Sequence, residues 1–150
     1  MALLVPLLSS PAFAADTEIS TSVGPQTWTS DDFLVTSTGA VDGGGADAIT
    51  VTAPGGGTLT NQGSITASGQ VGISTVGAFG AIVNSGSISD TSVGIRIVNP
   101  DGGTFTNEVS GSISGSVIGV SFAGTQITEF TNDGLISGDF AGLYASDALI

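Results

Sequence analysis

The chain has 150 residues, enough for one domain with a substantial core, and its formal net charge is −12. One arginine and no lysine exclude a nucleic-acid-binding surface and disfavour anionic membranes, because phosphate recognition needs many cationic side chains. The absence of cysteine excludes disulfides, thiolate metal sites and thiol nucleophiles. The 24 glycines predict many turns.

The N-terminal segment has the composition of a secretory signal peptide. An apolar run from Leu3 to Leu8 precedes Ala12-Phe13-Ala14, a small-x-small pattern that predicts cleavage near Ala14 or Ala15. The run is too short to span a bilayer, and a buried first strand is the alternative interpretation. Because no positively charged n-region precedes the run, we expect the true start to lie upstream of Met1. We expect residues 1–15 to be this export signal and residues 16–34 to be an N-terminal cap that leads into the fold.

An internal repeat occupies residues 35–150. A glycine-x-isoleucine step recurs at intervals of 23, 25 and 23 residues, after an apolar-x-asparagine step and before a small residue followed by an apolar one. A fifth, less regular unit comprises Val35, Ser37, Gly39, Val41, Ala48 and Ile49, with Ser37 in the place of the asparagine. The steps of the four regular units are Gly63/Ile65, Gly86/Ile88, Gly111/Ile113 and Gly134/Ile136, and Leu59/Asn61, Ile82/Asn84, Phe105/Asn107 and Phe130/Asn132.

Each unit predicts strands rather than a helix. Every second residue forms a regular series, as in Val71-Ile73-Thr75 and Val93-Ile95-Ile97, and alternation with period two places one set of side chains on one face. Three short strands in each unit of 22–25 residues match one rung of a parallel β-helix. The sequence therefore predicts an all-β protein, a right-handed parallel β-helix of about five rungs. In this fold Ile65, Ile88, Ile113 and Ile136 form one inward column.

The asparagine before each glycine is interpreted as structural. A bend between two strands favours residues that tolerate positive φ, which Asn and Gly supply. Stacked bends also allow each side-chain amide to bond to the next rung. We expect Asn61, Asn84, Asn107 and Asn132 to form this turn ladder. The alternative, a row of asparagines that binds a ligand, is not needed to explain their spacing.

The candidate catalytic residues do not form a recognisable set. Asp31 and Asp32 are adjacent and would point to opposite faces of a strand, and the positions that correspond to Asp90 in later units hold glycine. No histidine is present to activate a serine, and the lone Arg96 is interpreted as a solubilising charge rather than a stabiliser of an anionic intermediate. We therefore expect no catalytic residues and no enzyme activity within this sequence.

Two other stretches are candidate binding features. Residues 42–49, DGGGADAI, come within one residue of a calcium-binding nonapeptide, but calcium repeats need ligands from consecutive turns. We therefore expect no metal and no cofactor. If a face binds a partner, we expect it to carry the loops between units, 52–57, 77–80, 99–103 and 123–129, with Phe79 as an exposed aromatic residue.

A leader-like N-terminus followed by acidic, cysteine-free repeats of the form NxGxI…GI resembles the start of a Gram-negative autotransporter passenger domain. The resemblance covers about Asp16 to Ile150 and is one of repeat style, which adhesins of two-partner secretion share. It implies a right-handed β-helix carried to the cell surface by a C-terminal translocator barrel. No run of barrel strands occurs in this sequence, and the repeat stops in mid-rung after Tyr144, so we expect a fragment or a truncated reading frame.

The resemblance implies a non-enzymatic, surface-exposed or secreted stalk, exported to the outer membrane or the exterior of a Gram-negative cell. Its expected partners are a host-surface or extracellular-matrix ligand, or another copy of the chain through the open end of the last rung. One alternative is the N-terminal part of a secreted β-helical polysaccharide lyase or hydrolase with its active site beyond residue 150. The other is a calcium-binding repeat protein.

Overall fold

The computed structural model describes residues 17–29, 32–52, 56–98, 102–124 and 127–147. This part of the chain folds into eighteen short strands, without a helix, in three parallel sheets of six strands. Sheet A contains β1 (Thr17–Ile19), β4 (Phe33–Val35), β7 (Thr58–Asn61), β10 (Ala81–Asn84), β13 (Thr104–Asn107) and β16 (Glu129–Asn132). Sheet B contains β2 (Ser22–Val23), β5 (Ala40–Asp42), β8 (Ser64–Ala67), β11 (Ser87–Asp90), β14 (Ser112–Gly115) and β17 (Leu135–Gly138). Sheet C contains β3 (Gln26–Trp28), β6 (Ile49–Val51), β9 (Val71–Thr75), β12 (Val93–Val98), β15 (Ile118–Ala123) and β18 (Ala141–Ser146).

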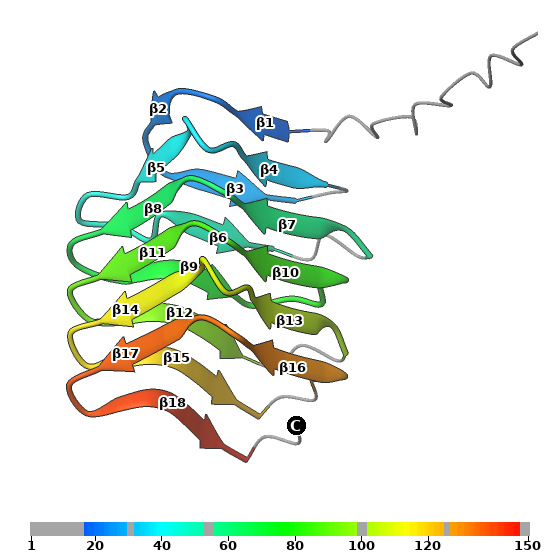
Figure 1. Ribbon diagram of the computed structural model, residues 1–150, viewed down its shortest axis with the longest axis vertical. Coiled ribbons are helices and arrows are strands. Elements are labelled where there is room, and N and C mark those ends of the chain that lie inside the picture. The colour runs from blue at the N-terminus through cyan, green and yellow to red at the C-terminus, as the bar shows by residue number, and fades with distance from the viewer. Residues whose placement is uncertain (1–16, 30–31, 53–55, 99–101, 125–126, 148–150) are drawn as a thin grey trace, which may run out of the picture.

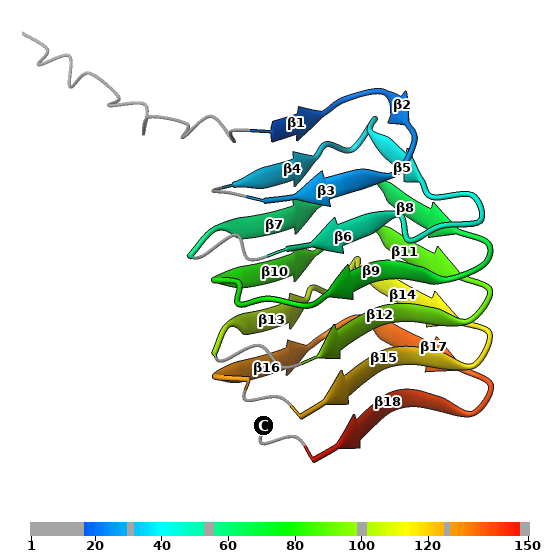
Figure 2. The ribbon, with the colours of Figure 1, turned by 180° about the vertical axis from the view of Figure 1, so that it is seen from behind.

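The strands form a parallel solenoid, as the repeat predicts. Every strand pairs with the strand three positions away in the sequence, so that three consecutive strands make one turn of the coil (Figure 1). The view from behind shows sheet C continuing along the whole stack (Figure 2). The five units expected from the sequence correspond to the turns that start at β4, β7, β10, β13 and β16.

The predicted isoleucine column is confirmed by the strand register. Ile65 pairs with Ile88, Ile88 with Ile113, and Ile113 with Ile136 along sheet B. Sheets A and C supply equivalent inward columns, because alternation along each strand places every second side chain inside. These columns are Phe33, Leu59, Ile82, Phe105 and Phe130 in sheet A, and Ile49, Ile73, Ile95, Val120 and Leu143 in sheet C.

Aromatic side chains fill the core near the later turns. Phe105 stacks on Phe130 with ring centroids 5.2 Å apart, and Phe122 meets both rings edge to face at 6.3 and 5.7 Å. Such pairs add about 0.5–1.5 kcal/mol each beyond the burial of their area. The same part of the coil therefore holds its turns together by stacking as well as by strand pairing.

The start of the solenoid differs from the sequence interpretation in two ways. The segment predicted as a cap contains β1, β2 and β3, which pair in parallel with β4, β5 and β6 and so make a first turn of the coil. The alignment of Ser37 with the asparagines is wrong, since Val35 is the register partner of Asn61. The bend between Val35 and Val41 is longer by two residues than the bend between Asn61 and Ile65, and the bend between Asn107 and Ile113 is longer by the same amount. Residues 1–15, the predicted export signal, lie outside the described residues.

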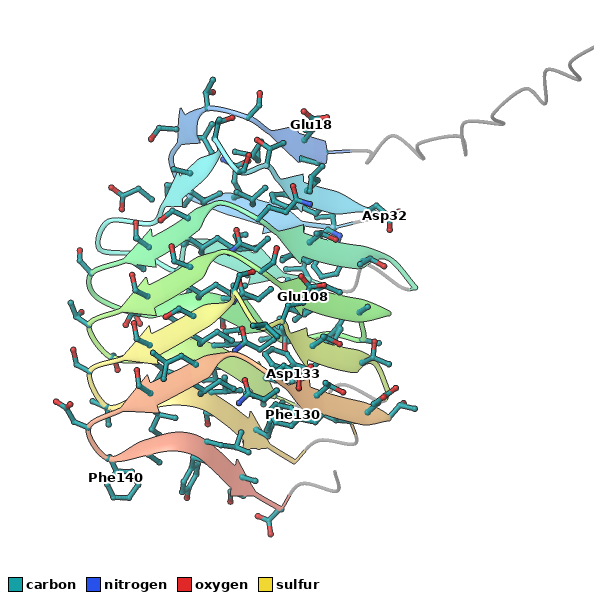
Figure 3. All side chains as sticks on the ribbon, viewed as in Figure 1. Glu18, Asp32, Glu108, Phe130, Asp133 and Phe140 are labelled. Atoms are coloured by element: carbon teal, nitrogen blue, oxygen red, sulfur yellow. The ribbon has the colours of Figure 1, made fainter. Side chains whose placement is uncertain are left out.

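The surface carries acidic side chains, and one end of the coil is apolar. Glu18, Asp32, Glu108 and Asp133 point outward from different turns (Figure 3). In the turn β16–β18 the exposed fractions are 59% for Leu135, 73% for Phe140, 44% for Leu143 and 41% for Tyr144. The described residues contain no helix long and apolar enough to cross a membrane.

Candidate functional site

The four predicted ladder asparagines lie one above another at the bend between sheets A and B. The side-chain amide of Asn61 donates to the Oδ1 atom of Asn84, Asn84 to Asn107, and Asn107 to Asn132, each at 2.8 Å. Asn61, Asn84 and Asn107 are fully buried, whereas Asn132 is exposed. The chain of amides supplies hydrogen-bond partners to polar groups inside the coil, where an unpaired amide would be costly.

The reason expected for the glycines of this bend is wrong. Among the described residues, left-handed φ angles occur only at Gly44, Gly102, Gly103, Gly124 and Asp147, and none of these belongs to the ladder bends. The bend glycines are required instead by close packing between turns. A Cβ atom at Gly86 would collide with the carbonyl oxygen of Gly63, and one at Gly111 with the side-chain oxygen of Asn107.

The stretch 42–49 forms a loop rather than a calcium turn. The Oδ1 atom of Asp42 accepts a hydrogen bond of 2.9 Å from the backbone N–H of Gly44, which has a φ of 54°. This Asx turn explains why aspartate stands at position 42 and glycine at position 44 without a bound ion. Among the described residues, no three or more His, Cys, Asp or Glu side chains are grouped so as to hold a metal.

The other candidate carboxylates have separate structural positions. Asp90 is 7% exposed and caps its own bend, where its Oδ1 atom accepts hydrogen bonds from the backbone N–H groups of Ser92 and Val93. Asp32 accepts a hydrogen bond of 2.9 Å from the N–H of Thr58, and Asp31 lies outside the described residues. Arg96 is exposed on sheet C, and its Nη2 atom lies 3.4 Å from the hydroxyl oxygen of Ser74. These side chains do not converge on one point.

The prediction that Phe79 is exposed is wrong. Its exposed fraction is 3%, and its ring belongs to the hydrophobic core. A Cβ atom at Gly103 of the following loop would collide with this ring, so that the two loops pack directly on each other. The absence of a side chain at Gly103 thus allows a close approach to the ring, which is not left without neighbours. Of the loops between units, residues 53–55, 99–101 and 125–126 lie outside the described residues.

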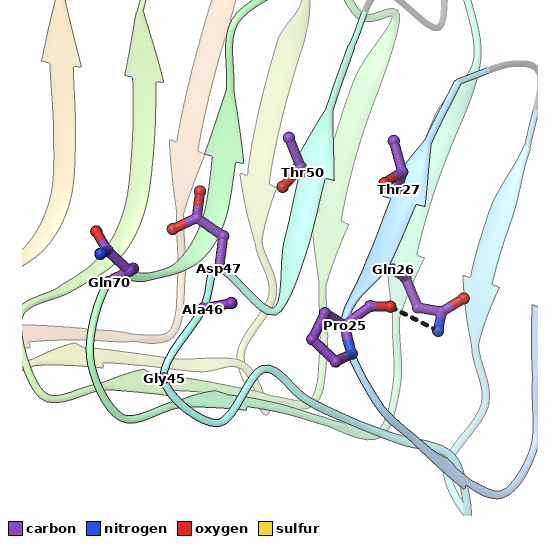
Figure 4. A pocket seen from close by; sticks show the side chains of 8 residues that line it. All are labelled: Pro25, Gln26, Thr27, Gly45, Ala46, Asp47, Thr50 and Gln70. Atoms are coloured by element: carbon purple, nitrogen blue, oxygen red, sulfur yellow. Dashed lines mark hydrogen bonds between the residues drawn. The ribbon is translucent and has the colours of Figure 1, made fainter.

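A groove that was not predicted from the sequence lies on the outer side of sheet C, and we call it the polar groove. It lies at the first turns, where the connection from β5 to β6 has six residues (43–48), against three from β8 to β9 and two in each of the other turns. The longer connection stands beside the strand faces of β3 and β6 (Figure 4). The cavity has a volume of about 420 Å³ and is lined by Pro25, Gln26, Thr27, Gly45, Ala46, Asp47, Thr50 and Gln70.

Backbone hydrogen bonds hold the wall of the polar groove in place. Ala46 N–H donates to Gly43 at 3.0 Å, and Ser68 donates to the carbonyl oxygen of Gly44 through both its N–H, at 2.7 Å, and its hydroxyl, at 2.9 Å. At the end of the loop, Ala48 accepts from the N–H of Gln26 at 2.8 Å and donates to Val71 at 3.1 Å. The loop is therefore attached to the turns on both sides, and the groove is preformed.

Four side chains of the polar groove have unused hydrogen-bonding capacity. Asp47 and Gln70 lie at one edge, and Thr50 and Thr27, which are register partners on β6 and β3, point to the same side of the sheet (Figure 4). None of these four side chains makes a hydrogen bond to another described residue, whereas the amide of Gln26 donates to the carbonyl oxygens of Gly24 and Pro25 at 3.0 Å. The groove thus offers one carboxylate, one amide and two hydroxyls to a ligand.

A second cavity of about 310 Å³ lies at the corner between sheets B and C in the later turns. Its lining includes Asp90 and Asp139 together with serine and glycine residues. The Oδ1 atom of Asp90 accepts hydrogen bonds at its own bend, whereas its buried Oδ2 atom has no hydrogen-bond partner among the described residues.

Comparison with protein-family models, with curated proteins and with solved structures finds no match to this chain.

Proposed function

We propose that the chain is an exported, non-enzymatic β-solenoid that serves as an adhesive or structural stalk at the surface of a Gram-negative cell, as the passenger domains of autotransporters do. The observation that carries the proposal is the unbroken register of three parallel sheets through successive turns. A solenoid of this kind lengthens by one turn at a time without a change in cross-section, and each turn contacts only its neighbours. Such a coil is suited to carrying a binding surface away from a membrane.

Composition supports the same proposal. The outward positions of sheet B are mostly serine and threonine, as at Ser64, Thr66, Ser87, Ser89 and Ser112, and the chain carries a net charge of −12 without cysteine. A polar, acidic exterior resists non-specific association between copies and with anionic lipid. A cysteine-free chain also cannot form disulfides in an oxidising periplasm before it reaches the exterior.

Export is tested by fusing a leaderless alkaline phosphatase, active only outside the cytoplasm, behind the full chain in a Gram-negative host. The variant Leu4→Arg/Leu7→Arg interrupts the apolar run and is expected to abolish phosphatase activity. The matched control Thr66→Arg/Ser89→Arg adds the same charge to the outer face of sheet B and is expected to retain it. Equal activity in the two variants, or none in the native fusion, contradicts the proposal.

Adhesion is measured separately. Beads coated with the full chain are expected to be retained under flow on glass coated with extracellular matrix. Retention no greater than that of beads coated with the heat-unfolded chain would contradict the adhesive role and leave a purely structural stalk.

A further inference from the structure

We propose that the polar groove binds a neutral glycan through the pyranose rings and vicinal hydroxyl groups of its sugars. The inference rests on the proposed adhesive function and assigns it a ligand class and a site. The groove is the place where the first turns depart from the regular repeat, because the β5–β6 connection is longer than its equivalents. Insertions in solenoids are commonly gathered on the binding face.

The free polar groups match a polyhydroxylated ligand. The carboxylate of Asp47 accepts hydrogen bonds from two hydroxyls, the amide of Gln70 both donates and accepts, and the hydroxyls of Thr27 and Thr50 do either. Hydrogen bonds to a charged group contribute about 1.5–3 kcal/mol, roughly twice the contribution of a neutral pair. Pro25 adds an apolar ring at the base of the same groove, against which the C–H face of a sugar packs (Figure 4).

Size and preorganisation are also appropriate. The volume of about 420 Å³ lies in the lower part of the range of about 300–1,000 Å³ typical of small-molecule sites, which suits a short segment of a glycan. The groove is open to solvent, so a chain of sugars can continue beyond it. Because hydrogen bonds to Gly43, Gly44 and Ala48 fix the loop backbone, little conformational entropy is lost on binding.

Other ligand classes fit the same residues less well. A divalent cation such as Ca²⁺ takes about 6–8 oxygen ligands and prefers several carboxylates, but Asp47 is the only carboxylate that lines the groove. Sulfated or sialylated glycans need cationic partners, and the groove has none in a chain of net charge −12. An apolar ligand would cover the free donors and acceptors of the groove and leave them without hydrogen-bond partners.

The experiment measures binding of the full chain to immobilised neutral polysaccharides, dextran, mannan and galactan, and to the anionic polymers heparin and polysialic acid. We expect binding to at least one neutral polysaccharide and none to the anionic ones. Asp47→Asn replaces the charged acceptor by a neutral amide of the same shape, Thr50→Val removes a hydroxyl with little change in shape, and Gln70→Ala removes the side-chain amide. We expect each to weaken binding about tenfold, which corresponds to about 1.4 kcal/mol.

Matched controls use exposed residues far from the groove. Asp133→Asn makes the same change of charge as Asp47→Asn, and Gln62→Ala the same change as Gln70→Ala. Both controls are expected to bind like the native chain, and circular dichroism establishes that all variants keep the β-sheet signal. The proposal is overturned if none of the neutral polymers binds at millimolar sugar, if the groove variants bind like their controls, or if only the anionic polymers bind.

The outcome is separable from that of the export assay. Export without glycan binding overturns the assignment of the groove alone. Glycan binding by a chain that remains in the cytoplasm overturns the proposed export alone.

Discussion

At the residue scale, the asparagine ladder supplies the main side-chain hydrogen bonds inside the coil. Each internal asparagine uses its Nδ2 group as a donor to the next turn and its Oδ1 atom as an acceptor from the turn before. The hydrogen bonds of the ladder all run in one direction, from Asn61 towards Asn132. In the turn before Asn61 the corresponding position holds Val35, so the Oδ1 atom of Asn61 accepts from the backbone N–H of Gly63 instead. Polar and apolar columns thus lie side by side in one core.

Asn84→Ala is expected to lower the free energy of unfolding by about 2–3 kcal/mol, measured by denaturant titration. Asn84 accepts a hydrogen bond from Asn61 and donates one to Asn107, and the change removes both bonds within a fully buried site. Asn132→Ala, at the exposed end of the ladder, is expected to cost less than about 1 kcal/mol. Equal losses in the two variants would contradict a ladder that is strongest in the interior.

Thr75→Val is expected to raise the free energy of unfolding by about 1 kcal/mol. Thr75 is fully buried between Val51 and Ile97 in an inward column, and its hydroxyl has no hydrogen-bond partner. Valine has nearly the same shape without the unpaired oxygen. The control Thr75→Ala also removes the methyl group and is expected to destabilise the chain. A Thr75→Val variant with a lower melting temperature than the native chain would contradict the prediction.

At the element scale, each turn is a unit of three strands whose bends differ in what they require. The bend between sheets A and B is tight, since backbone from one turn lies against the bend of the next. The connection between sheets B and C varies from two to six residues, and its longest form builds one wall of the polar groove. Both connections accept additional residues without loss of register, since the A–B bend itself has four residues between β4 and β5 and between β13 and β14 and two in the other turns.

Gly111→Ala is expected to destabilise the chain by about 1–3 kcal/mol, because the added methyl group would meet the Oδ1 atom of Asn107 and the carbonyl oxygen of Asn84. Gly24→Ala provides the control. No atom lies within 4 Å of a Cβ placed at Gly24, so that this change is expected to be neutral or slightly stabilising. Thermal melts of the two variants with the same midpoint would argue against tight packing at the ladder bend.

Much of the fold follows from the sequence because period-two alternation and the glycine-x-isoleucine step mark inward positions directly. The first turn was not predicted, since β1, β2 and β3 have only two or three residues each and the inward residues Ile19, Val23 and Trp28 share no repeat with later units. Phe79 was misplaced because close packing between loops of different turns leaves no local pattern in the sequence.

The polar groove depends on the same unrecognised turn. The sequence signal that was available is the length of 43–48, which exceeds the equivalent connection in every other turn. That stretch was compared with a calcium motif rather than with the repeat itself. Its position beside Pro25 and Thr27 could not be inferred until residues before Phe33 were seen to belong to the coil.

At the scale of the whole molecule, the two ends of the stack differ. In the first turn Trp28 is 1% and Ile19 is 9% exposed, whereas Leu135 and Phe140 of the last described turn are 59% and 73% exposed. Exposed apolar side chains beside unpaired strand edges favour association. The polar sides of the coil offer no comparable surface among the described residues, apart from isolated valines such as Val76 and Val109.

We predict that the chain self-associates through the turn β16–β18 at tens of micromolar, as measured by sedimentation velocity. Leu135→Ser/Phe140→Ser is expected to shift the distribution towards monomer, because it removes the most exposed apolar groups of that turn. The control Val109→Ser changes a residue that is 82% exposed at a different turn and is expected to have no effect. A native chain that remains monomeric with a cooperative melt would disprove this prediction.

The central claim is that successive repeats stack in parallel and in register, and cysteine cross-linking tests it most directly. The native chain has no cysteine, so that any disulfide comes from the introduced pair. Ser87 and Ser112 are register partners on β11 and β14, whereas Ser64 lies one further turn away, on β8. The Cα atoms of Ser87 and Ser112 are therefore about 4.8 Å apart, whereas those of Ser64 and Ser112 are about 9.6 Å apart, and only the first distance permits a disulfide. The account predicts rapid intramolecular oxidation of Ser87→Cys/Ser112→Cys and little oxidation of Ser64→Cys/Ser112→Cys. Equal oxidation of both pairs, or cross-links only between molecules, would contradict it.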